Sequence, residues 1–169
     1  MTAAVDWQGV LAVLASVAVA VVGFAGLLTA FSAANAPLAK SDVVNIRILL
    51  IFSLGALLFA ILPLPFADVP PQRLWPISTV LLGVFLLFWP IRSPAWNRRR
   101  GIRSRRPLLY WGMLGIEAVL GAVLLVRGVT GTADGGTYVL GVAWCLLVAT
   151  VTFVAQVFAL LPVDERPSP

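Results

Sequence analysis

The chain has 169 residues, of which 60% are hydrophobic and only 11% charged, and its mean hydropathy is +1.00. Soluble globular chains carry about 25% charged residues, so this composition excludes an ordinary water-soluble domain and predicts an integral membrane protein. The chain has no histidine and one cysteine, Cys145. An intrachain disulfide, a thiolate metal cluster and a histidine-ligated haem are therefore excluded. We expect no metal, no cofactor and no enzymatic activity, because the commonest general base is missing.

Five apolar stretches are long enough to cross a hydrocarbon core, which takes about 20 helical residues. No connection between them exceeds about 16 residues, which is too short to fold independently. We therefore expect an all-α integral membrane protein, a five-transmembrane-helix bundle that forms a single membrane domain over residues 1–169 with no soluble domain. Four spans with a re-entrant segment is the alternative. The expected spans are residues 7–31, 48–67, 74–91, 107–126 and 138–161.

The first stretch could be mistaken for a signal peptide, because small residues at 33–36 imitate a cleavage region. No lysine or arginine precedes it, however, and it is longer than the roughly 7 to 15 apolar residues of a signal sequence. We interpret it as a membrane anchor.

The distribution of cations predicts the orientation. With the N-terminus outside, ten of the twelve lysines and arginines fall in inner segments, and only Arg73 and Arg127 fall in outer ones. Cytoplasmic loops are enriched in lysine and arginine, so we expect an N-out, C-in protein of the plasma (inner) membrane. The dominance of arginine over lysine is associated with bacterial genomes of high GC content. Interfacial aromatic residues agree with these boundaries, with Trp7, Trp75 and Tyr138 expected at the outer ends.

Small side chains recur at three- and four-residue spacing along the first stretch, which places them on one helical face. Such a stripe lets another backbone approach closely, as is usual where membrane helices associate. The partner is a helix of the same chain, which we favour, or a second subunit. The stripe consists of Ala12, Ser16, Ala20, Gly23, Gly26 and Ala30.

Glu117 is the one ionisable side chain within the five predicted spans. It lies ten residues after Pro107, or roughly 15 Å along a helix, which is near the middle of a bilayer. Gly121, one turn away, would leave room beside the carboxylate. A carboxylate in low dielectric without a cation favours its protonated form.

Four other polar side chains are expected at a similar depth and could converge on Glu117. Thr152 and Gln156 share a face of the fifth span, while Ser53 and Ser16 lie near the middle of the second and first spans. The predicted intramembrane polar cluster is therefore Glu117, Thr152, Gln156, Ser53 and Ser16. Three roles fit Glu117: an interhelical hydrogen bond, part of a path for protons, cations or a cationic substrate, or a contact to another subunit, a pigment or a lipid.

The segment 92–107, RSPAWNRRRGIRSRRP, carries seven arginines. It is expected to fix the orientation and to contact anionic headgroups at the inner face, and docking of an acidic partner protein is the alternative. Nucleic-acid binding is not expected, because Trp96 alone is available for stacking. The predicted contacts to anionic lipid or a partner are Arg98, Arg99, Arg100, Arg103, Arg105 and Arg106.

Two remaining loops have structural explanations. Ser41 or Asp42 is positioned to cap the helix that follows. The segment TGTADGGT around Asp134 is typical of a flexible turn and is too sparse in carboxylates for a calcium site.

These features together predict a small non-enzymatic membrane protein that is an accessory or assembly subunit of a larger complex, or a homo-oligomer. The alternative is a small transporter or channel that uses Glu117.

Overall fold

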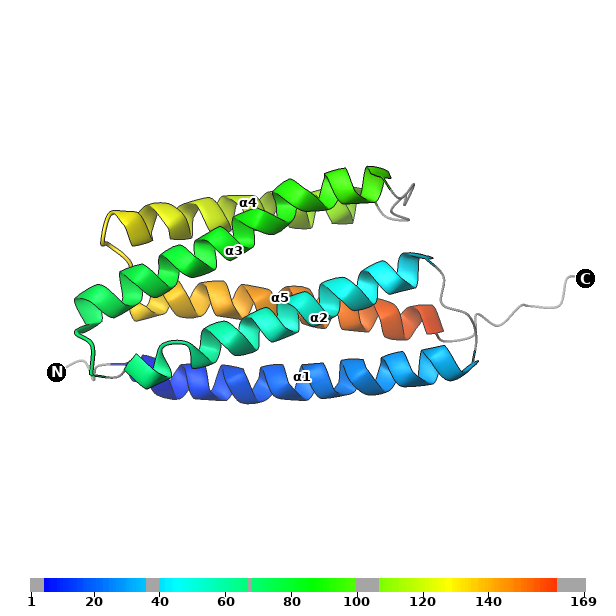
Figure 1. The fold of residues 1–169 in the computed structure, drawn as a ribbon, viewed down its shortest axis with the longest axis horizontal. Coiled ribbons are helices and arrows are strands. Elements are labelled where there is room, and N and C mark those ends of the chain that lie inside the picture. Colours follow the sequence, from blue (N-terminus) through cyan, green and yellow to red (C-terminus); the bar gives the residue numbers. More distant parts are fainter. Residues whose placement is uncertain (1–4, 36–39, 67, 100–106, 161–169) are drawn as a thin grey trace, which may run out of the picture.

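The structure is a computed structural model, and it describes residues 5–35, 40–66, 68–99 and 107–160. Within those residues it is built of helices and contains no strand. As predicted, five helices are long and apolar enough to cross a membrane. In chain order, the elements are α1 (Trp7–Asn35), α2 (Lys40–Ile61), the short 3-10 helix η1 (Leu64–Phe66), α3 (Pro71–Arg99), α4 (Pro107–Val129) and α5 (Gly135–Leu160) (Figure 1).

Two boundaries differ from the sequence-based expectation. Helix α2 begins at Lys40, so Ser41 and Asp42 lie in its first turn, and their side chains, on which the capping prediction depends, lie outside the described part. Helix α3 continues to Arg99, well past residue 91, and therefore includes Arg98 and Arg99, whose side chains lie outside the described part. The other predicted contact residues, Arg100, Arg103, Arg105 and Arg106, are outside the described residues altogether.

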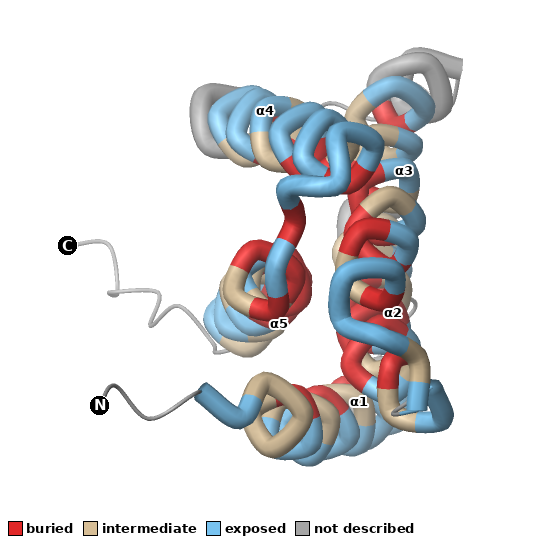
Figure 2. The backbone as a smooth tube through the Cα atoms, turned by 90° about the vertical axis from the view of Figure 1, so that its left-hand side faces the viewer, coloured by how far each residue is buried: buried red, intermediate tan, exposed pale blue. Residues whose placement is uncertain are grey.

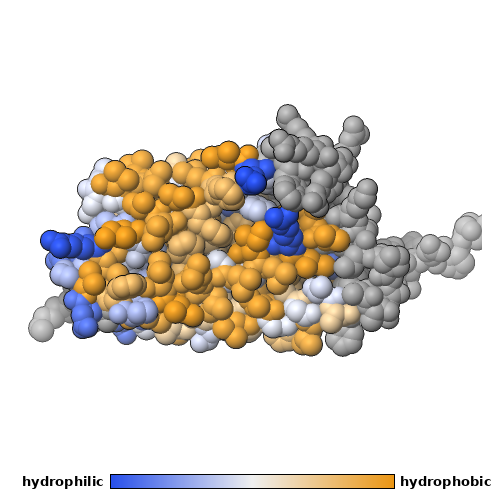
Figure 3. All heavy atoms as spheres, viewed as in Figure 1, coloured by the Kyte–Doolittle hydropathy of each residue, from blue (hydrophilic) through white to orange (hydrophobic). Residues whose placement is uncertain are grey.

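The five long helices run side by side along one axis (Figure 1). Seen along that axis, α5 lies on the concave side of an arc formed by α4, α3, α2 and α1 (Figure 2). The buried core contains Leu11, Phe52, Leu82, Leu124 and Val142, one from each long helix. The face of the molecule seen in Figure 3 is also apolar over most of the described length, as expected of a bundle whose sides face hydrocarbon.

Glycines bring α3 and α4 into backbone contact. A Cβ atom added at Gly83 of α3 would lie 2.8 Å from the Leu125 nitrogen and 3.1 Å from the Gly121 oxygen of α4. One added at Gly128 of α4 would lie 2.9 Å from the Pro76 oxygen. Only glycine fits at this separation, so these residues set the distance between the two helices.

A short turn reverses the chain between α4 and α5. Gly131 has φ +70°, and the Thr132 amide donates to the Arg127 carbonyl at 2.9 Å, which together form a Schellman-type helix end. Asp134 then caps α5, because its Oδ1 accepts from the Thr137 backbone nitrogen at 2.8 Å and from the Thr137 hydroxyl at 2.6 Å. The pKa of Asp134 is held below its usual value. The causes are the hydrogen bonds that its carboxylate accepts from the Thr137 hydroxyl and backbone nitrogen, and the positive charge of Arg127.

Helix α1 packs through a different face from the predicted one. The residues that it buries in the bundle, Leu11, Ala18 and Ala25, recur every seven residues. All six residues of the predicted stripe are exposed instead, and a Cβ added at Gly23 or Gly26 would meet nothing within 4 Å. The expectation that the stripe packs within the chain is therefore wrong. The exposed residues are Ala12, Ser16, Ala20, Gly23, Gly26 and Ala30.

Gly83→Ala should destabilise the protein, because the new methyl would press on the backbone of α4 and force the helices apart. We expect a loss of about 1–3 kcal/mol in the free energy of unfolding, measured by denaturant titration in detergent micelles with tryptophan fluorescence. Gly115→Ala is the matched control, because a Cβ there meets nothing within 4 Å. Equal stability of the two variants would contradict a glycine-set contact.

Candidate functional site

Glu117 is buried inside the bundle, with 3% of its surface exposed. Its Oε1 atom has no hydrogen-bond partner among the described residues. Two arginines at the ends of the predicted spans have defined contacts elsewhere: Arg127 donates to the Thr137 hydroxyl at 2.9 Å, and the Arg92 guanidinium lies 5.6 Å from the Phe88 ring centroid. A charge on Glu117 would thus lack compensation by those two cations.

The α4 face that carries Glu117 is directed at α3. Gly121, Leu124 and Gly128 share this face and are buried with it. The sequence suggested that Gly121 would leave free space next to the carboxylate. It does not, because Leu86 and Leu87 of α3 fill the position of its missing side chain. On α5, Cys145 lies within electrostatic range of Glu117. Glu117 is therefore buried on the face of α4 that packs against α3.

The structure does not join the predicted polar cluster through hydrogen bonds. The hydroxyl of Ser53 donates to the Leu49 carbonyl at 2.6 Å, and that of Thr152 donates to the Val148 carbonyl at 2.8 Å. Each bond stays within its own helix, which is the usual way for a serine or threonine hydroxyl to be satisfied in an apolar span. Glu117 is a partner in neither bond.

The two remaining members of the cluster lie apart from Glu117 in other ways. Gln156 is fully buried and its Oε1 accepts from Asn45 Nδ2 of α2 at 3.4 Å. Ser16 is exposed on the outer face of α1, where its hydroxyl donates to the Ala12 carbonyl at 3.0 Å. The prediction that Ser16 points into the bundle is wrong, because the side of α1 that packs is the Leu11–Ala18–Ala25 face.

Burial leaves several polar atoms unpaired within the described residues. Besides Glu117 Oε1, they are Thr79 Oγ1, Trp144 Nε1 and Gln156 Nε2. An unsatisfied buried donor or acceptor costs about 1–3 kcal/mol, so native proteins contain few of them. Glu117 stands out in this set because it alone can carry a charge.

A hydrogen bond that the sequence did not reveal ties α2 to α5. The Tyr138 hydroxyl donates to the Phe59 carbonyl at 2.6 Å, and Tyr138 is fully buried near the start of α5. Pro63, four residues after Phe59, has no N–H to bond that carbonyl. A proline in an apolar span was therefore the sequence signal for such a bond, because the carbonyl four residues before it needs a donor from elsewhere.

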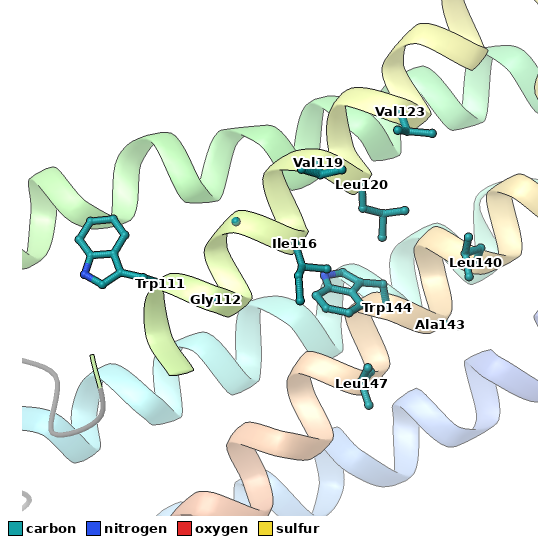
Figure 4. Close-up of a pocket in the computed structure, with 11 residues that line it drawn as sticks. Trp111, Gly112, Ile116, Val119, Leu120, Val123, Leu140, Ala143, Trp144 and Leu147 are labelled. Atoms are coloured by element: carbon teal, nitrogen blue, oxygen red, sulfur yellow. The ribbon is translucent and has the colours of Figure 1, made fainter. Parts of the chain in front are cut away.

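A groove of about 740 Å³ separates α4 from α5 on one side of the bundle. Its walls are apolar and include Trp111, Ile116 and Val119 from α4 and Trp144 and Leu147 from α5 (Figure 4). Glu117 is not among its lining residues, because it is on the face of α4 that packs against α3.

Comparisons with known proteins do not assign the chain to a family. No protein-family model matches the sequence, no curated protein matches it, and no solved structure matches the fold. Within the described residues, no three histidine, cysteine or acidic side chains are grouped so that they could hold a metal ion. The geometry of the chain itself is thus the basis for a functional proposal.

Tyr138→Phe should destabilise the bundle, because it leaves the buried Phe59 carbonyl without a donor. We expect a loss of about 1–3 kcal/mol in the free energy of unfolding, measured in detergent micelles. Tyr110→Phe makes the same chemical change where the hydroxyl pairs with Ser93 at 2.7 Å and is only half-buried, so it should cost less. The reverse order would show that the bond to Phe59 is not an important link between α2 and α5.

Proposed function

We propose that the chain is a small non-enzymatic multi-pass protein of the plasma membrane, with its N-terminus outside and its C-terminus in the cytoplasm. It acts as an accessory or assembly subunit of a larger membrane complex or as a homo-oligomer. The positive-inside bias supports this orientation, and the lack of histidine and of clustered acidic residues in the sequence supports a role without catalysis. The run of arginines from residue 92 to 106 contacts anionic headgroups.

The observation that carries the subunit role is the outward direction of the small-residue stripe on α1. This helix has only 17% of its span inside the bundle, against 28% to 44% for the other four. Its outer face presents Ala20, Gly23 and Gly26, which allow a second helix to approach closely. A helix that contributes so little to its own core and exposes a close-packing face is suited to contact with another chain.

Disulfide cross-linking in membranes tests this role. In a Cys145→Ala background, Gly23→Cys and Gly26→Cys should form cross-linked products upon mild oxidation, either dimers or adducts with a partner. Val17→Cys is the matched control, because Val17 is 45% exposed on α1 but lies roughly 120° around the helix from Gly23 and roughly 180° from Gly26. Docking through the stripe would be contradicted if the stripe variants gave no cross-linked product. It would also be contradicted if Val17→Cys gave as much product as they do.

The second candidate is a small transporter or channel that uses Glu117. The observation that favours it is a deeply buried carboxylate with an unpaired oxygen, because ionisable residues in membrane spans commonly mark ion or substrate paths. Against it, the groove beside α4 is apolar and excludes Glu117. Neighbouring helices enclose the carboxylate within one chain, so this function would need a second copy to build a pathway.

Flux measurements separate the two candidates. Under the subunit proposal, Glu117→Gln reconstituted in liposomes should match the wild type in proton, sodium and potassium flux, because glutamine preserves the shape and polarity of a neutral carboxyl group. Circular dichroism and the elution volume in size-exclusion chromatography, each compared with the wild type, establish that the variant is folded. A large loss of one of these fluxes, with Ser53→Ala behaving as the wild type, would favour the transporter.

A further inference from the structure

The bundle divides into two groups of helices. Glycines bring α3 and α4 into backbone contact, and α1, α2 and α5 pack against one another. The backbones of α2 and α3 approach each other little, although the two helices are consecutive in sequence. They meet through rings instead, since the centroid of the Phe85 ring lies 5.3 Å from that of Phe59 and 6.0 Å from that of Phe52. We call the two groups the α3–α4 pair and the α1–α2–α5 group.

Both chain connections between the two groups lie at one end of the bundle, on the left in Figure 1. One joins α2 to α3 through η1, and the other is the turn between α4 and α5. The connections from α1 to α2 and from α3 to α4 each join helices of a single group. The covalent chain therefore ties the groups together at the end with the α4–α5 turn, which we call the turn end. It leaves them untied at the opposite end, which we call the Gln156 end.

The polar contacts follow the same division. At the turn end, Arg127 of α4 donates to the Thr137 hydroxyl of α5 at 2.9 Å, and this bond crosses from one group to the other. At the Gln156 end, the Ser93 hydroxyl pairs with the Tyr110 hydroxyl at 2.7 Å within the α3–α4 pair. Gln156 of α5 accepts from an asparagine of α2 at 3.4 Å, within the α1–α2–α5 group. These bonds join the groups at the turn end and reinforce each group by itself at the Gln156 end.

Glu117 and Gln156 have unpaired polar atoms on the two sides of the boundary between the groups. Glu117 Oε1 of α4 and Gln156 Nε2 of α5 are buried and lack a hydrogen-bond partner among the described residues. Cys145 of α5 lies within electrostatic range of Glu117, and Gln156 lies within about 20° of Cys145 around the helix axis. The side of α5 that is directed at Glu117 therefore also carries Gln156.

Opening of the boundary at the Gln156 end would give both unpaired atoms a partner. Water satisfies buried polar groups that have no protein partner, and each unpaired group raises the free energy of the closed bundle. A rigid-body rotation of about 15° about the turn end would displace helices about 30 Å long by about 8 Å at their far end. That displacement is wide enough to admit water.

We propose that the α3–α4 pair swings away from the α1–α2–α5 group about the turn end, and that the open state admits water to Glu117 and Gln156. The opening is on one side only, so it does not by itself make a path across the membrane. The inference rests on the proposed membrane insertion and is independent of the role of α1. Co-flotation of the protein with vesicles checks insertion separately, and the flux measurements check transport separately, so a failure of either is distinguished from a failure to open.

Distances between two spin labels, measured by double electron–electron resonance in liposomes, test the proposal. The labels are attached at exposed positions in a Cys145→Ala background. Trp111→Cys with Phe158→Cys spans the two groups at the Gln156 end, and Val129→Cys with Leu140→Cys spans them at the turn end. The first pair should show a second population of distances about 8 Å longer than the first. The second pair should show a single distance, because it lies next to the pivot.

A label pair within one group is the further control. Ile91→Cys with Trp111→Cys joins exposed positions of α3 and α4 near the Gln156 end, and it should show a single distance because the α3–α4 pair moves as one body. A single distance for the pair that spans the groups at the Gln156 end, as narrow as in the controls, would overturn the proposal. Two populations in all three label pairs would also overturn it, because the movement would then not be a rotation about the turn end.

Variants that remove the unpaired atoms should favour the closed state. Glu117→Met and Gln156→Met should each lower the ratio of long to short distances about fivefold or more, because water then stabilises the open state less. If one of them fails to fold, the other provides the same test. Thr79→Val is the matched control, because it also removes a buried unpaired atom. Thr79 lies at the turn end, one helical turn after Trp75, whose ring centroid is 5.9 Å from that of Tyr138, so this variant should leave the ratio unchanged. An equal effect of all three variants, or an unchanged ratio in the folded methionine variants, would show that the unpaired atoms do not drive the opening.

Discussion

The backbone contact between α3 and α4 is the constraint on which the rest of this bundle depends. Gly83, Gly121 and Gly128 let the two helices approach until a single methyl group would collide with the opposite backbone. This contact fixes which face of α4 is inside, and it therefore buries Glu117 against α3. The opposite face of α4 is left to form one wall of the groove beside α5. A buried acid and an open apolar groove are two consequences of the same packing.

Polar groups in such a bundle must be satisfied without water, and the chain does so in two ways. Hydroxyls of Ser53 and Thr152 bond carbonyls of their own helices, which makes no demand on neighbours. The Phe59 carbonyl cannot be satisfied within its helix because Pro63 lacks an N–H, so it takes the hydroxyl of Tyr138 from α5. Glu117 follows neither route for its Oε1, and this is the physical reason that it remains the residue of greatest functional interest.

Residue spacing shows which residues share a helical face, but it does not show which face meets which neighbour. Two sets of small residues lie along α1, and both have spacings that suit close packing. The bundle uses the set with Ala18 and Ala25, together with Leu11, and leaves the set with Ala20 and Gly23 outside. Estimates of depth from the helical rise were equally limited, because residues at one depth can point in different directions. Ser16 at mid-span illustrates this, since it is exposed.

The sequence by itself determined the class of structure: five apolar helices, a single buried acid on the fourth, and cations concentrated in the connection before it. These follow from composition and from the length of helix that crosses a hydrocarbon core, which are local properties. Only the tertiary structure decided that Gly121 is filled by α3, that Tyr138 bonds a carbonyl freed by Pro63, and that α4 and α5 enclose a groove. Such outcomes depend on how helices rotate and approach one another, and lipid-facing and helix-facing apolar residues look alike in sequence because hydrocarbon and leucine are equally apolar.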